Sequence, residues 1–454
     1  MALSLYFMKT KRTVVHSVPY EFPLDRHLYG QTFVIADHVR HSENNTAVFT
    51  QSPYNLNDSN FGKLQRRVAR DKLGTELVFS QDLTVQHPKR AYDVSRTALF
   101  PFLDARVNEG PVSYDAHYFR DGNYPEFEQI KQRFGDDVDF FVHLHCLSTL
   151  FLGDLNVSEL THRQKKVRDN LLRTMDKYSP KIIAVSNAVR DSFYQHGILP
   201  NGSLEVVHNG VETDLYRKAS DKEKEDFRRE LGINASRLVG YVGRIEDIKG
   251  ADTLLGILSR HPDLGQDVGF VIATTDGRKA GAFLDKVRRD LPELVEDNRI
   301  KFCVDASKLT AGFYKRDSEV CRYFDGLAQN LGFGKSFGDV LTRPLHPHLD
   351  VYVQPSNSEA LGLSVVEAGM SEVPVVASEI GGIPEVVNVN AGTLVPIKDR
   401  KREDVVDDFT FAIKHHLSTQ TNPVVSDSNR TNLIRKGFDA RTMASKLDGL
   451  YSRD

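Results

Sequence analysis

The chain has 454 residues, of which 40% are hydrophobic, and this length and composition suit two or three domains with substantial apolar cores. A formal charge of −3 argues against general nucleic-acid binding, so we expect no nucleic-acid partner. Three scattered cysteines exclude a disulfide framework, and the absence of a membrane-spanning apolar run or a signal-peptide pattern predicts a cytoplasmic protein.

Strand-like segments alternate with helix-like segments through the first half of the chain. The predicted strands are residues 13–18, 46–51, 76–79, 138–145, 181–185 and 204–207, and the first helix is expected over 31–40. This alternation is typical of a parallel α/β structure, in which ligands bind at loops beyond the carboxyl ends of the strands. The first such loop carries Arg26, His27, Tyr29 and Gly30. It is a candidate part of a ligand crevice, with an ordinary surface loop as the alternative.

Two later segments of this half have less specific patterns. Residues 61–74 suit a helix with one apolar face surrounded by cations, and Gly74 is a suitable helix stop. This helix either docks an anionic acceptor or a membrane surface, or is an ordinary solvated helix. Residues 88–128 are rich in Tyr, Phe, Arg and Asp, a composition that suits a polar acceptor pocket.

Residues 137–146 predict a buried strand with polar residues at its carboxyl end. A histidine there, such as His145, points toward the crevice, although a structural role is the alternative. Asp137 and Asp139 have the Asp-x-Asp spacing of some metal sites, but they precede the strand, and we expect no metal there. Asn209 and Gly210 are a turn signal, and a linker helix is predicted over 217–230.

The second half opens with a predicted strand, a glycine turn and two cations, Arg244 and Lys249, five residues apart. Arginine offers a planar fork and lysine a point charge, and both suit phosphate oxygens. These two residues are therefore candidates for phosphate binding, with solvated surface charges as the alternative.

Residues 351–387 form a predicted strand, loop, helix and strand. Glu359 lies just before the helix expected over 361–370, and Glu367 lies about two turns inside it. A helix N-terminus offers unpaired N–H groups that favour phosphate. A carboxylate beside such a seat suits a neutral hydroxyl or a developing cation instead. Further strands are expected over 268–274 and 299–304.

Taken together, these segments resemble the retaining, nucleotide-sugar-dependent glycosyltransferases of the GT-B fold, in particular their family 4. The family signature is two glutamates separated by seven residues, as in Glu359 and Glu367, although Ala360 and Leu361 replace its usual Gly-Phe. The resemblance implies an α/β fold with two Rossmann-like domains facing an interdomain cleft. Residues 1–215 would bind the acceptor, residues 216–438 would bind the nucleotide sugar, and a terminal helix in 439–454 would pack back on the first domain.

The resemblance also implies roles for individual residues. Glu359 would contact hydroxyls of the donor sugar and Glu367 the ribose, while His145 would lie near the reacting centre, so that His145 and Glu359 are the catalytic candidates. The remaining donor-binding candidates are Gly243, Arg244, Lys249, Gly362 and Leu363, and the nucleobase would lie near residues 303–308. Gly30, Arg26, His27 and Tyr29 would form the loop between donor and acceptor. No residue is assigned to a metal.

The implied reaction moves a hexose or hexosamine from a nucleotide-diphosphate sugar to a hydroxyl acceptor, with retention at the anomeric carbon. No cofactor is obligatory, and a UDP-sugar is the expected donor, with GDP- and ADP-sugars as alternatives. The acceptor is a small molecule, a glycan or a lipid-linked molecule, which leaves peripheral membrane contact open. The rival functions are a non-catalytic nucleotide-sugar-binding scaffold subunit and a GT-B epimerase or phosphorylase, because one fold serves many functions.

Overall fold

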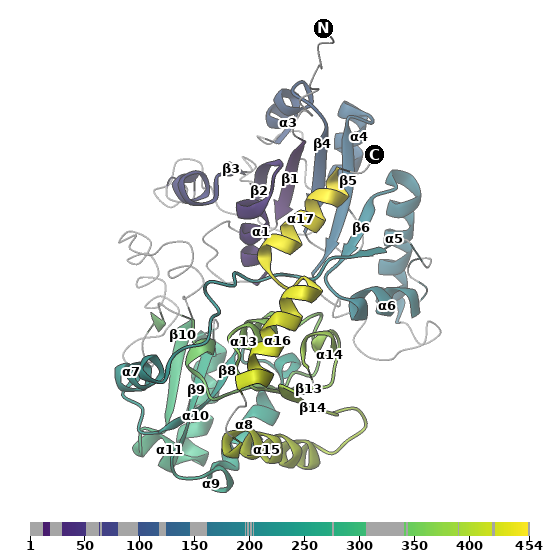
Figure 1. The fold of residues 1–454 in the computed structure, drawn as a ribbon. Coiled ribbons are helices and arrows are strands. Elements are labelled where there is room, and N and C mark those ends of the chain that lie inside the picture. Colours follow the sequence, from purple (N-terminus) through teal and green to yellow (C-terminus); the bar gives the residue numbers. More distant parts are fainter. Residues whose placement is uncertain are drawn as a thin grey trace.

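The protein was analysed as a computed structural model, and Figure 1 shows two α/β units stacked one above the other. The structure describes residues 12–18, 30–50, 66–79, 99–117, 124–145, 161–195, 204–274, 277–305, 340–341, 344–388, 390–419 and 423–452, together with a few isolated positions. Within these residues, every helix is too short or too polar to cross a bilayer.

The first unit is built on a seven-stranded parallel sheet with strand order β3-β2-β1-β4-β5-β6-β7. Its strands are β1 Thr13–Val18, β2 Asn45–Thr50, β3 Glu76–Phe79, β4 Val112–Ala116, β5 Val138–Leu144, β6 Lys181–Ala184 and β7 Leu204–Val206. Its helical segments are α1 Gly30–His41, a π-helical turn η1 Ala69–Leu73, α3 Leu99–Val107, α4 Pro125–Phe134, α5 His162–Tyr178 and α6 Asn187–Gln195.

The second unit repeats this design with strand order β11-β10-β9-β8-β12-β13-β14, again all parallel. Its strands are β8 Arg237–Val242, β9 Val268–Thr274, β10 Ile300–Asp305, β11 Val340–Leu341, β12 Val351–Gln354, β13 Val375–Ser378 and β14 Gly392–Val395. Its helical segments are α7 Asp221–Leu231, η4 Asp247–Lys249, α8 Ala251–Ser259, α9 His261–Leu264, α10 Gly277–Asp290, α11 Pro292–Glu296, η6 His346–His348, α13 Leu363–Met370, α14 Ile383–Val386, α15 Arg402–Ser418 and α16 Pro423–Lys436.

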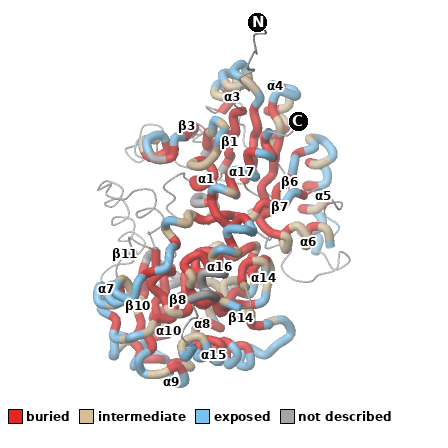
Figure 2. The backbone as a smooth tube through the Cα atoms, in the orientation of Figure 1, coloured by how far each residue is buried: buried red, intermediate tan, exposed pale blue. Residues whose placement is uncertain are grey.

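Both sheets are covered by helices on each face, so most strand residues are buried, and the strands of the second sheet are largely apolar. Every residue of β9 is buried, and Figure 2 shows the strands as a buried centre with exposed helix surfaces outside it. In the first sheet, one face packs against α1 and the C-terminal helix α17 Ala440–Tyr451, and the other packs against α3, α4 and α5. In the second sheet, α8, α10 and α15 cover one face and α13, α14 and α16 the other.

The C-terminal helix α17 returns to the first unit and lies beside α1 (Figure 1). Asp448 of α17 accepts a hydrogen bond from His38, and the Tyr451 hydroxyl donates to Asp115 Oδ2 across 2.5 Å. Val211, which follows β7, forms a parallel bridge with Asp439, the N-cap of α17. Domain boundaries near residues 215 and 438 stay a prediction.

The two units also meet directly, at the carboxyl edges of their sheets. The Ser186 hydroxyl, just beyond β6, donates to the Ala360 carbonyl across 2.5 Å. Nearby, Glu385 of α14 accepts bonds from the first backbone N–H groups of α6, those of Asn187 and Ala188, at 3.0 and 2.9 Å. A carboxylate of one unit therefore caps a helix N-terminus of the other, an arrangement favoured by the helix dipole.

Three local expectations from the sequence need correction. The segment 88–128 contains a central strand, β4, and two helices, and Tyr114 is buried in the core instead of lining a polar pocket. Asn209 and Gly210 run extended toward the Val211 bridge and do not form a turn. The linker helix begins only at Asp221, because Ser220 forms a capping box with Glu223 there.

Candidate active site

The candidate donor residues gather at the point where the strand order of the second sheet reverses. β8 and β12 are neighbours, but their following segments lead to opposite sides of the sheet. Loops beyond the carboxyl ends of such strands separate and leave space for a ligand. The loop after β8 carries Arg244 and Lys249, and the loop after β12 carries Glu359. The fold thus brings together residues that are about a hundred positions apart in sequence.

An ion pair joins these two loops. Lys249 Nζ lies 2.6 Å from Glu359 Oε1, and Glu359 is only 9% exposed. Backbone bonds reinforce the contact, since the N–H groups of Asn357 and Ser358 donate to the Ile248 carbonyl across 3.0 and 3.2 Å. The structure therefore brings together the predicted donor cation Lys249 and the predicted catalytic carboxylate Glu359.

Glu359 is held further by polar side chains that sequence reasoning missed. Ser356 Oγ donates to Glu359 Oε1 across 3.0 Å, and the Gln354 amide lies 3.4 Å from the same oxygen. Gln354 is fixed in turn by the Tyr352 hydroxyl, which bonds to its side-chain oxygen. The three residues alternate along the end of β12 and so share one face. Their alternation, at every second position from 352 to 356, is the sequence signal that could have identified them.

Two glycines allow the loops to approach this closely. Gly250 has φ +73°, and a Cβ at this position would lie 1.8 Å from the Pro355 carbonyl oxygen. Gly381 has φ +54°, and a Cβ there would lie 1.7 Å from the Glu359 carbonyl oxygen. Only glycine combines this backbone conformation with such contacts. The loops after β8, β12 and β13 therefore pack closely against one another around the Glu359 backbone.

Arg244 lies at the edge of these packed loops. Its side chain is 42% exposed and makes an ion pair with Glu246 at 3.0 Å. The backbone is better fixed, because the buried Tyr241 hydroxyl donates to the Arg244 carbonyl across 2.8 Å and Gly243 N–H continues the ladder to Ala273. Arg244 thus combines an anchored backbone with a side chain accessible to an anionic ligand.

The helix after Glu359 begins two residues later than expected. Gly362 is left-handed, with φ +87°, and is the N-cap of α13, so Leu363 is its first helical residue. Glu367 then lies little more than one turn inside the helix, where it is 1% exposed and 3.6 Å from His346 Nε2. Both predicted diphosphate-binding amides are consequently at the helix N-terminus.

His145 lies on the other unit, one residue beyond β5. Its Nε2 lies 2.7 Å from His117 Nδ1, and its ring stacks on His143 with centroids 4.3 Å apart. Burial and repulsion from His143 and His117 lower the pKa of His145 well below its usual value, which favours the neutral ring. His145 and Glu359 are each bonded within their own unit, so the structure does not join the two catalytic candidates.

The structure describes the predicted acceptor loop only at its last residue. Gly30 is the first residue of α1. Arg26, His27 and Tyr29 lie outside the described residues, as do residues 306–308 of the predicted nucleobase segment. The described part of the cationic helix over 61–74 ends in the π-turn η1, and Gly74 closes it in the left-handed conformation.

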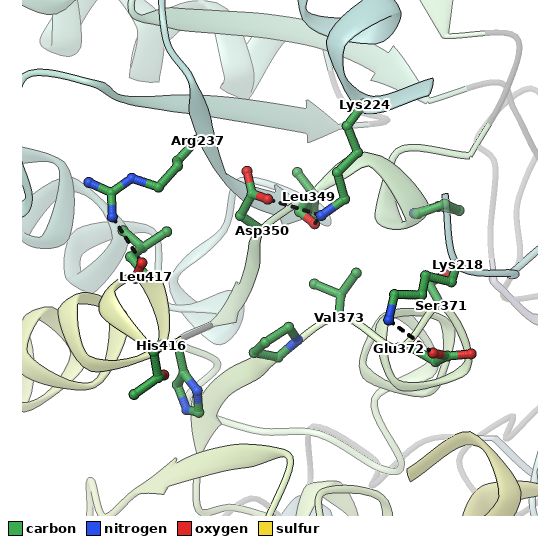
Figure 3. Close-up of a pocket in the computed structure, with 13 residues that line it drawn as sticks. Lys218, Lys224, Arg237, Leu349, Asp350, Ser371, Glu372, Val373, His416 and Leu417 are labelled. Carbon is green, nitrogen blue, oxygen red and sulfur yellow. Dashed lines mark hydrogen bonds and ion pairs between the residues drawn. The ribbon is translucent and has the colours of Figure 1, made fainter. Parts of the chain in front are cut away.

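A cavity of ≈ 190 Å³ lies elsewhere in the second unit (Figure 3). It is lined by residues at the amino ends of β8, β12 and β13, among them Arg237, Asp350 and Val373. Its charges are paired, with Lys224 Nζ 2.9 Å from Asp350 and Lys218 Nζ 3.5 Å from Glu372, as the dashed lines in Figure 3 mark. Ligands of open α/β sheets bind at the carboxyl ends, so this cavity is not the candidate donor site.

Comparison with known proteins finds a family match in the second unit, which carries the candidate donor site. Residues 332–420 match the family described as "Glycosyl transferases group 1". Alpha-maltose-1-phosphate synthase of Mycolicibacterium smegmatis is 29% identical over 261 residues, or 57% of each protein. D-inositol 3-phosphate glycosyltransferase of Corynebacterium aurimucosum is 26% identical over 222 residues, 47% of this chain and 44% of that protein. The chain matches about half the length of these curated relatives.

Solved structures extend the likeness to the whole fold. Anabaena HepE, crystallised with UDP and glucose, has a TM-score of 0.64 at 16% identity and covers 97% of this chain and 99% of its own. Sucrose-phosphate synthase of Thermosynechococcus elongatus has a TM-score of 0.63 at 16% identity, with 97% and 98% covered. The predicted α/β fold with two Rossmann-like domains is thus confirmed, and it is the fold of GT-B glycosyltransferases.

Proposed function

We propose that this protein, whose relatives are glycosyltransferases, moves a hexose or hexosamine from a nucleotide-diphosphate sugar to a hydroxyl acceptor with retention at the anomeric carbon. The observation that carries the proposal is the Lys249–Glu359 pair at the strand-order reversal of the second sheet. It places a cation, a carboxylate and the N-terminus of α13 at one edge, where a diphosphate and a sugar would lie side by side.

The donor is proposed to be a UDP-sugar, with GDP- and ADP-sugars as the alternatives. HepE, which shares the fold, was crystallised with UDP and with UDP-glucose, and this supports a uridine donor here. The sugar nucleotide would occupy the second domain, residues 216–438, and the acceptor the first, residues 1–215. The proposal includes no obligatory cofactor and no metal in the reaction.

Bond breaking leaves negative charge on the diphosphate, and the proposed role of Arg244 and Lys249 is to meet this charge. Arg244 is accessible and its backbone is anchored, so its fork is free to reorient from Glu246 to a phosphate. Lys249 bridges Glu359 and the phosphate in this scheme. Gly243, and the backbone amides of Gly362 and Leu363, complete the phosphate seat. Fixed positive groups of this kind stabilise the transition state more than the ground state.

The sugar itself would be positioned from both domains. Glu359 would accept hydrogen bonds from sugar hydroxyls, while Lys249, Ser356 and Gln354 fix its carboxylate. Glu367 would bind the ribose. His145, neutral and near the carboxyl edge of the first sheet, would lie on the opposite side of the reacting carbon. The departing phosphate would help to deprotonate the acceptor on the same face, which accounts for retention without a covalent intermediate.

The acceptor side of the proposal rests on the first domain. The loop that ends at Gly30, with Arg26, His27 and Tyr29, would separate donor from acceptor. The cationic helix ending at Gly74 would contact an anionic acceptor or the surface of a membrane. A cytoplasmic enzyme with peripheral membrane contact would serve a lipid-linked acceptor, and one without it a small molecule or a glycan.

Donor binding can be tested with a panel of UDP-, GDP- and ADP-sugars, scored by thermal shift and by mass spectrometry of hydrolysis products. We expect one donor to raise the Tm of the wild type, and Arg244→Ala to abolish this shift without changing the Tm of the unliganded protein. Arg260→Ala is the matched control, because Arg260 is also 42% exposed and paired with an acid, Asp407, in the same unit. Its ligand shift should equal that of the wild type.

Either of two results would contradict the proposal. One is the absence of any shift with nucleotide sugars or free nucleoside diphosphates, which would favour a scaffold function. The other is isomerisation of the donor to another nucleotide sugar without any acceptor, instead of its hydrolysis, which would favour an epimerase. A shift that survives in Arg244→Ala would move the donor site away from the loop after β8.

A further inference from the structure

Polar side chains gather on one face of the first sheet, at its own strand-order reversal. β1 and β4 are neighbours there, and His16 and Asp115 are register partners across them. His143 of β5 continues this face, and so do His117 and His145, each one residue beyond the end of β4 or β5, because alternate residues of a strand point the same way. Helices α1 and α17 cover the face and add His38, Asp448 and Tyr451. His16, Asp115, His117 and His143 are buried.

Three possible metal-ligand atoms of this cluster lie close to one another. His16 Nδ1 lies 2.8 Å from His117 Nε2 and 3.8 Å from Asp115 Oδ2. His117 Nε2 and Asp115 Oδ2 are 3.2 Å apart. Two ligands bound at about 2.05 Å to one tetrahedral zinc ion are roughly 3.3 Å apart. The observed separations bracket this value. We propose that His16, Asp115 and His117 bind a divalent transition-metal ion of the zinc type.

The charge of Asp115 gives an independent reason for a cation. The carboxylate is 0% exposed, and its ion-pair partners within the described chain are all histidines, namely His16, His117 and His143. Its Oδ1 has no hydrogen-bond partner among the described residues. A buried carboxylate without a cation is costly, whereas carboxylate and imidazole together are a preferred donor set for zinc.

Each of the three ligands also has an outer partner that fixes its orientation. His16 Nε2 lies 2.9 Å from His38 Nδ1, and His38 Nε2 lies 3.2 Å from Asp448. Tyr451 donates to Asp115, and His117 Nδ1 lies 2.7 Å from His145. Metal-bound histidines characteristically donate their second N–H to a partner of this kind. When His117 binds through Nε2, its Nδ1–H donates to His145, which then carries its own proton on Nδ1.

The burial of the ligands makes this a structural site, in contrast to catalytic zinc sites that keep an open position. His143, whose Nδ1 lies 3.4 Å from Asp115 Oδ2, is the nearest further donor. The ion would bind α17 and α1 to the sheet through Tyr451 and His38. It would also set the orientation of His145 from behind, without contacting a substrate.

The test measures zinc in the full-length protein, purified without a metal-affinity step, by mass spectrometry after dialysis. We expect about one zinc ion per chain, and a Tm that falls by several degrees on removal of the ion with a strong chelator. Added Zn²⁺ should restore the Tm, and Mg²⁺ should not. Substitution with Co²⁺ should give a visible absorption band from nitrogen and oxygen ligands.

Variants then locate the ion. Asp115→Asn and His117→Gln should lose zinc, and His261→Gln should keep it, because His261 is equally buried but lies in the second unit. If the first two variants fail to fold, the wild-type chelation and Co²⁺ measurements still decide. Zinc content well below one per chain, with no Tm response to Zn²⁺, would overturn the proposal. So would a Zn²⁺ response that is unchanged in a folded Asp115→Asn variant.

Discussion

At the scale of single residues, the Lys249–Glu359 pair is where the charges of the candidate site are balanced. Both side chains are mostly buried, at 21% and 10% exposed, so solvent screens the pair little. Three donors, Lys249, Ser356 and Gln354, serve one carboxylate oxygen of Glu359. The polar groups of the site therefore bond to one another. A ligand would compete with Glu359 for Lys249 instead of binding to an unpaired charge.

A double-mutant cycle should show this coupling. We expect Lys249→Met alone to destabilise the protein by about 1–3 kcal/mol, because it leaves Glu359 without its cation. Glu359→Gln in the same background should recover much of this loss. Urea denaturation gives the coupling energy, and Arg260 with Asp407, a more exposed pair, is the control, expected at about 1 kcal/mol or less. Equal coupling in both pairs would contradict the burial argument.

At the scale of elements, close backbone approach fixes the site. The turn η4 is pressed against the end of β12 through Gly250, and the loop after β13 is pressed against Glu359 through Gly381. Helix α13 begins at Leu363 because Gly362 takes the left-handed N-cap conformation. The candidate site is thus built from three strand ends and one helix that pack closely against one another.

Gly250→Ala should cost at least about 2 kcal/mol, because it combines a positive φ with a Cβ 1.8 Å from the Pro355 carbonyl. Gly449→Ala is the control, since a Cβ there meets nothing within 4 Å and the residue lies inside helix α17. That change should be neutral or stabilise by up to about 1 kcal/mol. Thermal denaturation compares the two, and similar Tm values would mean that the loops relax apart.

At the scale of the whole molecule, Glu385 connects the two units. Its carboxylate accepts bonds from the backbone of Asn187 and Ala188, from the Asn187 side chain at 2.7 Å, and from His208 at 2.9 Å. Burial alone raises the pKa of Glu385, but the bonds from His208, Ala188 and Asn187 outweigh it and lower the pKa to about 2. Ser186 and Ala360 add a second contact beside the candidate site.

Glu385→Ala should loosen this junction by about 1–2 kcal/mol, seen as faster hydrogen exchange at the start of α6. Glu379→Ala is the control, because Glu379 is an exposed carboxylate on a nearby loop of the same unit. The pH dependence has a defined sign. The folded pKa lies below the ordinary value of 4.5, so the stabilisation is complete above pH 4.5 and is lost as the pH falls toward 2.

The difference in Tm between wild type and Glu385→Ala should therefore shrink between about pH 6 and about pH 3. A difference that stays constant over this range would show that the carboxylate charge does not hold the two units together.

The sequence by itself determined the fold class and most strands, because apolar segments of strand length separated by turn residues are a local property. β1, β3 and β9 have the predicted bounds, and Arg244, Lys249 and Glu359 stood out through their charge beside apolar strands. β4 was missed, since Tyr114, Asp115 and His117 look polar in sequence. Tyr114 is buried on the face covered by α4, and Asp115 and His117 are buried on the opposite face, under α1 and α17. Pairings such as Lys249 with Glu359, Glu385 with α6, and His16 with Asp115 were decided by tertiary structure alone. They depend on which strands become neighbours, and no local pattern of residues encodes that order.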